Sequence, residues 1–307
     1  MSHISLSREA KLNLILFMVV LCLSLIAWYQ PGLQKTMVHY LSNIKADNIH
    51  SIVIERQGIG TVKLSKQNNN WFIEQPYQLP ANSLRVDTIT ALAEKRSYSQ
   101  FQVKKSDLGR YQLDNPPLII TLNSQKFALG ATDPIKKQRY AISVDNSSDN
   151  IMVHLINGVI YYQLRAALNT FISPSLVPPQ AKITRIDWAD KILTVNNGLW
   201  QLTPEDPEVS TDSMLQFVQY WQQTQASRVE TEVSVNITNS EQVINKSNSK
   251  SIVIHYDLPG NKSEKLNYLI IQDDKQLKLV RTDMKIAYWL SAKQLQKITE
   301  FLPLINE

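Results

Sequence analysis

Histidine, cysteine and serine are the side chains of this 307-residue chain most able to do chemistry, and their spacing matches no familiar site. The five histidines include no H-x-x-x-H pair, the spacing of many helical zinc sites. Cys22 is the only cysteine, which excludes an intrachain disulfide and a cysteine-based zinc site. No serine lies in a G-x-S-x-G elbow, and no glycines form a phosphate-binding loop. We therefore expect a protein that is not an enzyme and carries no cofactor or metal.

Two histidines and one acidic loop are the remaining candidates for a catalytic or metal-binding role. His154 and His255 fall in predicted strands, where a packed histidine is the simpler interpretation. Glu205, Asp206 and Glu208 crowd a proline-bounded loop that could hold a cation, although a solvated loop is the simpler interpretation. An enzyme would require such carboxylates to converge with one of these histidines in a cleft.

Basic residues provide the best candidate contact surface of the body. Lys136, Lys137 and Arg139 cluster near Lys104 and Lys105, and the basic excess of the chain lies in its first half. Such a cluster suits anionic lipid headgroups, whereas a solvated loop is the alternative. Aromatic residues do not alternate with these basic residues, so we expect no nucleic-acid partner.

An uncharged apolar segment from Leu12 to Tyr29 places the protein at a membrane. Roughly 20 helical residues, rising 1.5 Å each, cross the roughly 30 Å hydrocarbon core of a bilayer. Trp28 and Tyr29 stand at its end, where amphipathic rings prefer the headgroup layer. Arg8 and Lys11 precede the segment and predict a cytoplasmic N-terminus.

Two alternatives to a permanent anchor are a cleaved signal peptide and a lipoprotein signal. Bulky Trp28 follows Ala27, which makes a poor cleavage site. Leu21 precedes Cys22 where a lipoprotein signal needs a small residue. We therefore predict a single-pass protein of the bacterial inner membrane, with its soluble body in the periplasm and both the bilayer and integral membrane proteins as partners.

The segment after the anchor, residues 31–47, alternates apolar and polar residues at helical spacing. It predicts an amphipathic linker helix. Its face either contacts the membrane or a partner, or packs against the body as a helical stalk. The candidate contact residues on this face are Leu33, Met37, Tyr40, Leu41 and Ile44.

The soluble body contains an internal duplication. In each half, a three-stranded meander leads through a tryptophan strand into prolines, a capped helix, two hairpins and a final helix. The meander strands are Ser51–Arg56, Thr61–Lys66 and Trp71–Glu74, repeated as Lys182–Trp188, Ile192–Val195 and Leu199–Thr203. The hairpin strands are Leu118–Leu122, Lys126–Leu129, Arg139–Val144 and Ile151–Leu155, repeated as Ser251–Tyr256, Leu266–Ile271, Gln276–Arg281 and Ile286–Leu290. The final helices are Leu164–Phe171 and Ala292–Phe301, and only the second half has a polar stretch, Asn236–Lys250, before its hairpins.

Several of these features together resemble a bacterial family designated domain of unknown function 4340. The resemblance rests on the anchor, the tryptophan closely followed by proline, the segment Tyr111–Pro116, Gly130 at a strand end, and the strand that begins at Arg139. Gln112 stands where a glycine often follows the tyrosine in that family, so this turn is expected to differ. The resemblance implies no activity, and it implies an accessory role near transport components.

The chain is thus expected to be an α+β protein with one transmembrane helix and two similar domains, each a curled antiparallel sheet with two helices. Its expected divisions are a cytoplasmic tail (1–11), the transmembrane helix (12–30), the amphipathic linker helix (31–47), the first repeat (48–178) and the second repeat (179–307). The leading functional hypothesis is a non-catalytic accessory or scaffold subunit of an inner-membrane complex, with a transport complex as the candidate. The alternative is a periplasmic module that binds a glycan, lipid or small ligand in the groove between the repeats.

Overall fold

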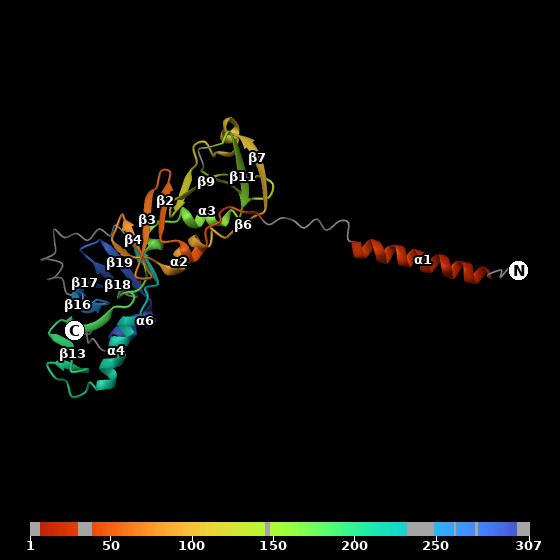
Figure 1. The fold of residues 1–307 in the computed structure, drawn as a ribbon. Coiled ribbons are helices and arrows are strands. Elements are labelled where there is room, and N and C mark those ends of the chain that lie inside the picture. The colour runs from red at the N-terminus through yellow and green to blue at the C-terminus, as the bar shows by residue number, and fades with distance from the viewer. Residues whose placement is uncertain are drawn as a thin grey trace. The chain divides into compact units, whose positions relative to one another are not determined.

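A computed structural model of the chain describes residues 7–29, 39–144, 148–231, 249–260, 262–273 and 276–299. Between His39 and Tyr40 the chain divides into two units. Figure 1 shows the fold and labels many of its elements. The helices are α1 (Arg8–Tyr29), η1 (Ala46–Asn48), α2 (Ser83–Thr90), η2 (Lys105–Tyr111), α3 (Val159–Leu164), η3 (Leu168–Phe171), α4 (Thr211–Gln223) and α6 (Ala292–Thr299), where η marks a 3₁₀ helix. The strands are β1 (His39–Tyr40), β2 (Ser51–Arg56), β3 (Gly60–Gln67), β4 (Asn70–Gln75), β5 (Leu79–Pro80), β6 (Arg96–Ser97), β7 (Ser99–Lys104), β8 (Leu118–Leu122), β9 (Gln125–Thr132), β10 (Arg139–Ser143), β11 (Asn150–Ile156), β12 (Lys182–Trp188), β13 (Lys191–Asn196), β14 (Leu199–Thr203), β15 (Arg228–Glu230), β16 (Ser249–Leu258), β17 (Lys262–Asp273), β18 (Gln276–Arg281) and β19 (Ile286–Leu290).

Helix α1 is apolar on every side. The hydroxyl of Ser7 accepts a hydrogen bond from the backbone N–H of Ala10 at 3.2 Å, and Glu9 lies in the first turn, where the helix dipole favours a carboxylate. The large apolar side chains between Leu12 and Ile26 are 46–69% exposed. A helix without a polar face suits a lipid environment. By length and composition α1 is therefore a membrane anchor or a signal sequence.

The first sheet runs through residues 51–156 and is antiparallel throughout the described residues. Its strand order is β5-β4-β3-β2-β8-β9-β10-β11-β7. Buried and less buried positions alternate strictly in β2, as expected for a strand with one face on a core. Helix α2 contacts β4 and α3 and buries Val86 and Ile89. Its N-cap is Asn82, whose side chain accepts a hydrogen bond from the backbone N–H of Arg85.

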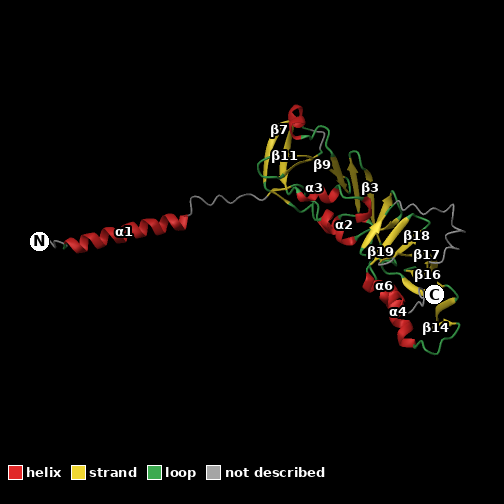
Figure 2. Cartoon of the chain, turned by 180° about the vertical axis from the view of Figure 1, so that it is seen from behind, coloured by secondary structure: helices red, strands yellow, loops and turns green. Residues whose placement is uncertain are grey.

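The second sheet runs through residues 182–290 and is also antiparallel in its described part. Its strand order is β14-β13-β12-β16-β17-β18-β19-β15. Helix α4 buries a row of large side chains against this sheet: Met214, Phe217, Val218 and Trp221. The Tyr220 hydroxyl donates to the carbonyl oxygen of Gln294 at 2.9 Å and joins α4 to α6, which lie side by side in Figure 2.

The two sheets share one order of strands. If β5 is set aside, each strand of the first sheet has a counterpart at the same position of the second, and edge strands β7 and β15 both follow the first helix of their half. The expected α+β architecture with two large antiparallel sheets is therefore confirmed. The sequence placed the last helix of the first half at Leu164–Phe171, whereas the structure has α3 at Val159–Leu164 and the short η3 after it. The polar stretch Asn236–Lys250 falls almost entirely outside the described residues.

One apolar core connects the two sheets. A single cluster of buried side chains extends from Leu41 to Ile298. The chain between the sheets takes part in it: Leu176 is buried, and its carbonyl oxygen accepts a 2.6 Å hydrogen bond from the hydroxyl of Tyr268. The backbone N–H of Ala226 also donates to the carbonyl oxygen of Pro174 at 2.7 Å. Residues 40–307 accordingly form one compact unit rather than two independent cores.

The prediction of an amphipathic helix over residues 31–47 is wrong for residues 39–47. Residues 39–48 form β1, an irregular stretch and η1. The Ser42 hydroxyl accepts a hydrogen bond from the backbone N–H of Ile44 at 2.9 Å, and the Glu94 carboxylate accepts one from Ala46 at 3.0 Å. These bonds take donors that a helix would use, while Leu41 enters the main core as an extended segment.

The segment Tyr111–Pro116 contributes to a second, smaller apolar cluster with one face of the first sheet. Gly130 in β9 makes the close contact possible. A Cβ atom at Gly130 would lie 2.2 Å from the carbonyl oxygen of Tyr111 and 2.9 Å from the Leu113 side chain. Gln112, where a glycine was noted as frequent, caps η2 in the left-handed conformation with φ 54°.

We predict that Gly130→Ala lowers the free energy of unfolding by about 1–3 kcal/mol, because the new methyl group forces backbone and side chain apart. Urea unfolding followed by tryptophan fluorescence measures this change. Gly109→Ala is the matched control, since its Cβ would meet only the Asp114 carboxylate at 3.3 Å. Equal midpoints for the two variants would show that the close contact at Gly130 is not a constraint.

We predict that Gln112→Gly raises the free energy of unfolding by up to about 1 kcal/mol, because glycine adopts positive φ without the Cβ clash. The same unfolding experiment measures the shift. Gln112→Ala keeps the Cβ and serves as the control, with an expected change below about 0.5 kcal/mol. A Gln112→Gly midpoint at or below the control would contradict the assigned backbone conformation.

Candidate functional site

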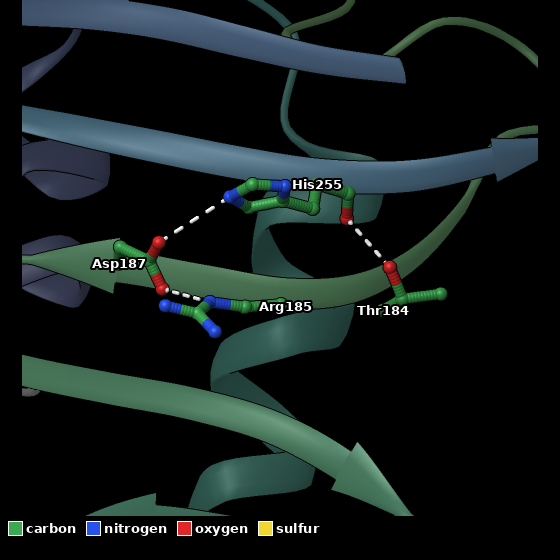
Figure 3. A network of polar contacts seen from close by, with 4 residues as sticks. All are labelled: Thr184, Arg185, Asp187 and His255. Carbon is green, nitrogen blue, oxygen red and sulfur yellow. Dashed lines mark hydrogen bonds and ion pairs between the residues drawn. The ribbon is translucent and has the colours of Figure 1, made fainter. Parts of the chain in front are cut away.

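The polar group closest to acid–base chemistry lies on the second sheet (Figure 3). β12 and β16 are neighbours, and Arg185 pairs directly with His255 in their register. Both residues and Asp187 are partly exposed rather than part of the core. The two oxygens of Asp187 have different partners: Oδ2 lies 3.3 Å from His255 Nε2, and Oδ1 accepts a 2.6 Å hydrogen bond from Arg185 Nε.

The polar side chains of this group contact mainly one another. An aspartate beside a histidine is the pairing that orients an imidazole for proton transfer. The nearby hydroxyl, that of Thr184, donates to the backbone oxygen of His255 at 3.3 Å and does not reach the ring nitrogens. Because Arg185 already binds the carboxylate, we interpret the group as an ion cluster between strands that borders a shallow depression of about 520 Å³.

The possible metal ligands, the acidic loop and His154 form no second candidate site in the described residues. Within the described ranges, no three His, Cys, Asp or Glu side chains converge on a possible metal position. In the acidic loop, Asp206 forms an ion pair with Lys191 at 3.0 Å, and this contact lowers the pKa of its carboxyl group. His154 is buried in β11 between the neighbouring strands β10 and β7.

The expected basic cluster divides into an exposed and a buried part. Lys136 and Lys137 are exposed in the connection between β9 and β10. Beside them, the side chain of Ile135 is 85% exposed. The Asp133 carboxylate accepts a 2.7 Å hydrogen bond from the backbone N–H of Lys136 and holds this connection in shape.

Arg139 does not belong to this surface, and its assignment as a contact residue is wrong. It is buried, its guanidinium carbon lies 3.4 Å from the centroid of the Tyr161 ring, and Nη1 donates to the Gly130 carbonyl oxygen at 2.6 Å. Burial lowers the pKa of Arg139 from its usual value. Alternation along β10 turns Arg139 inward, so Arg139 packs α3 against the sheet.

The remaining candidate contact residues have mixed positions. Trp28 is 89% exposed at the end of α1, and Tyr40 is 50% exposed. Leu41 is buried and Ile44 packs against the main core, so neither is available to a partner, contrary to expectation. Tyr29 is the last residue of α1, and its side chain is not described. Leu33 and Met37 lie outside the described residues.

A groove with contributions from both halves lies beside Trp71. Its volume is about 380 Å³. Trp71 and Phe72 come from the first sheet, Asn82 from the start of α2, and Pro174 and Gln225 from the chain beyond α3 and α4. Trp71 and its counterpart Trp200 are only partly buried and both pack against the main core. The groove is thus a real concavity whose tryptophan also serves the core.

The structure shows two further surfaces that the sequence did not reveal. Leu84, Val159 and Tyr162 on α2 and α3 are 77%, 58% and 70% exposed, and Leu84 and Val159 border a groove of about 500 Å³ between these helices. A second pocket of about 390 Å³ lies beside the smaller cluster, under the segment Lys105–Pro116. The continuous buried run Phe127–Gly130 in β9 is the sequence signal that a sheet is covered on both faces.

The comparisons with known proteins identify a family. No curated protein and no solved structure showed significant similarity to the chain. A family model described as domain of unknown function DUF4340 matches residues 71–253, from the first sheet into β16 of the second. This match covers more than half of the chain, and the protein therefore belongs to the DUF4340 family.

Proposed function

We propose that the protein is a non-catalytic accessory or scaffold subunit of a bacterial inner-membrane complex, with a transport complex as the candidate, and that its body lies in the periplasm. The observation that carries the proposal is the combination of an apolar α1 with exposed apolar side chains on α2 and α3. Contiguous exposed apolar side chains are typical of protein contact surfaces. The positive residues before the apolar segment support a cytoplasmic N-terminus.

The body proposed to make these contacts consists of two copies of one α+β unit, residues 48–178 and 179–307, each a curled sheet with two helices. The shared strand order and the equivalent places of α2 and α4 support a duplication. The copies differ in their helices: α2 has eight residues and α4 has thirteen. Leu84 and Val159 border the groove between α2 and α3 in the first copy.

A second candidate function is a binding module in the groove beside Trp71. The observation that favours it is that both halves line this groove, as expected for a site formed by joining two copies. The partial burial of Trp71 in the main core reduces the aromatic surface open to a ligand. The accessory-subunit proposal therefore has the stronger support.

We predict that α1 is retained as an anchor. The mature protein from the membrane fraction should contain the apolar segment by intact mass, and it should resist carbonate extraction. Leu16→Arg places a charge in the middle of the segment, which costs about 2.5–3.5 kcal/mol in insertion, and should release a large fraction of the protein. Ser24→Ala, which adds no charge, is the control. A mature mass that lacks the segment would identify a cleaved signal sequence instead.

We predict that Leu84→Asp weakens assembly. After gentle detergent extraction, native mass analysis should show the wild-type protein in a larger complex and a several-fold smaller complexed fraction for the variant, because a charge then faces an apolar contact. Ile59→Asp is the matched control, since Ile59 is 47% exposed at a distant hairpin turn. A lone wild-type monomer in every mild condition would reject the scaffold function.

A further inference from the structure

The pocket beside the smaller apolar cluster has the composition of a ligand site; we refer to it as the outer pocket. Its volume is about 390 Å³, within the range of small-molecule sites. Buried side chains of the cluster form its floor: Leu108, Leu113, Ala128, Ile142 and Ile151. Partly exposed Pro116 and Ile119 and exposed Val144 form its edge. A ligand can therefore reach apolar surface from solvent.

The outer pocket lies beneath one local segment of the first half. η2 and the residues to Pro116 form this segment between β7 and β8, and the corresponding stretch of the second half, between β15 and β16, lies almost entirely outside the described residues. This segment joins the smaller cluster, which is separate from the main core. The main core is complete without it, so the segment is available for a role besides holding the two sheets together.

The lining favours an aliphatic ligand over a sugar. Phe101, Tyr111 and Tyr140 are the aromatic rings of the smaller cluster, but they contact one another with centroids 4.9–6.3 Å apart and none lines the outer pocket. Sugars need stacking rings and several polar partners. The floor instead offers methyl and methylene groups, which an alkyl chain contacts well.

The charges at the outer pocket favour an anionic end group. Lys105 and Lys126 both line it. Lys105 is exposed and forms no ion pair with the described residues, whereas Lys126 lies 3.6 Å from Glu55 in a half-exposed pair. Asp114 also lines the pocket, and its carboxylate lies against the backbone of Gly109. Among the described lining residues, Lys105 and Asp114 thus form no ion pair, and an anionic group is expected at the Lys105 end of the pocket.

We propose that the outer pocket binds a single alkyl chain that ends in an anionic group, with the chain on the apolar floor and the anion near Lys105. The ligand class is an acyl chain with a carboxylate or phosphate, as in a fatty acid or a single-chain phospholipid. This inference is independent of the accessory-subunit proposal, because it needs no protein partner.

The test uses the full chain reconstituted in phosphatidylcholine nanodiscs and a photoreactive diazirine analogue of dodecanoic acid. After irradiation, peptide mass mapping should locate the label in residues 105–119 or 142–151. Unlabelled dodecanoate should compete at lower concentration than dodecanol. Competition by a single-chain phosphatidic acid of equal chain length compares a phosphate with a carboxylate as the anionic source.

Two variants separate the pocket from its charge. Val144→Trp at the exposed edge should block labelling without disturbing the core. Lys105→Glu should raise the half-competition concentration of dodecanoate about five-fold and leave that of dodecanol unchanged. Lys182→Glu, an exposed residue of the other sheet, is the control and should change neither. Far-UV circular dichroism checks that each variant is folded.

Three results would overturn the proposal. Label spread along the chain, or none, would show that the outer pocket is only structural. Equal competition by acid and alcohol, unaffected by Lys105→Glu, would show a neutral apolar pocket. Labelling that persists in the folded Val144→Trp variant would place the ligand elsewhere. A lone wild-type monomer in every mild condition, together with intact labelling, would reject only the accessory-subunit proposal.

Discussion

Alternation along antiparallel strands gives each sheet an apolar face that must be covered, and the covering elements determine most of the remaining structure. In β2 and β8 every second side chain is buried. If such a face stayed in contact with water, the folded protein would lose roughly 25 cal/mol of stabilisation for each Å² of apolar surface left exposed. Helices α2, α4 and α6, the linker after β1 and the chain around Leu176 all contribute to one shared core as a result.

The same strand order is covered in two ways. In the second half α4 supplies large aromatic side chains to the core. Its residues Phe217 and Trp221 form a continuous series of ring contacts with Trp188 and Tyr268. In the first half α2 is short, and Leu41 and other residues from outside the helix add to the core instead. The first half is covered also on its other face, where η2 and its following residues form the smaller cluster. The outer pocket lies beside this smaller cluster.

Local patterning predicted the strands whose alternation is strong. β2, β8, β12 and β14 have the bounds expected from the sequence, because buried and exposed positions alternate or a turn with Asn and Gly fixes the end. β7 and β15 were missed, since each pairs with a strand distant in the sequence, β11 or β19, and that partner cannot be inferred from a local pattern. Residues 39–47 have helical spacing, but side-chain bonds from Ser42 and Glu94 and burial of Leu41 outweigh it.

Candidate surface residues were harder to predict than strands, because burial decides them. Arg139 stands two residues from Lys137 in the sequence, yet the strand turns it under Tyr161 while the lysine stays in the connection. The outer pocket required knowledge of which segment covers the second face of β9. No spacing in the sequence indicates that the carbonyl oxygen of Tyr111 approaches Gly130.

Exposed side chains without polar partners support the contact surface proposed on α2 and α3. In the second half polar groups bind one another: Asp187 binds Arg185 and His255, and Trp289 donates to Glu230 at 2.7 Å. A partner would have to break or desolvate these contacts, and the gain would be small. In the first half the side chains of Leu84, Tyr162 and Lys136 are exposed and form no hydrogen bond or ion pair with the described residues. Such side chains can contribute to binding without first breaking polar contacts.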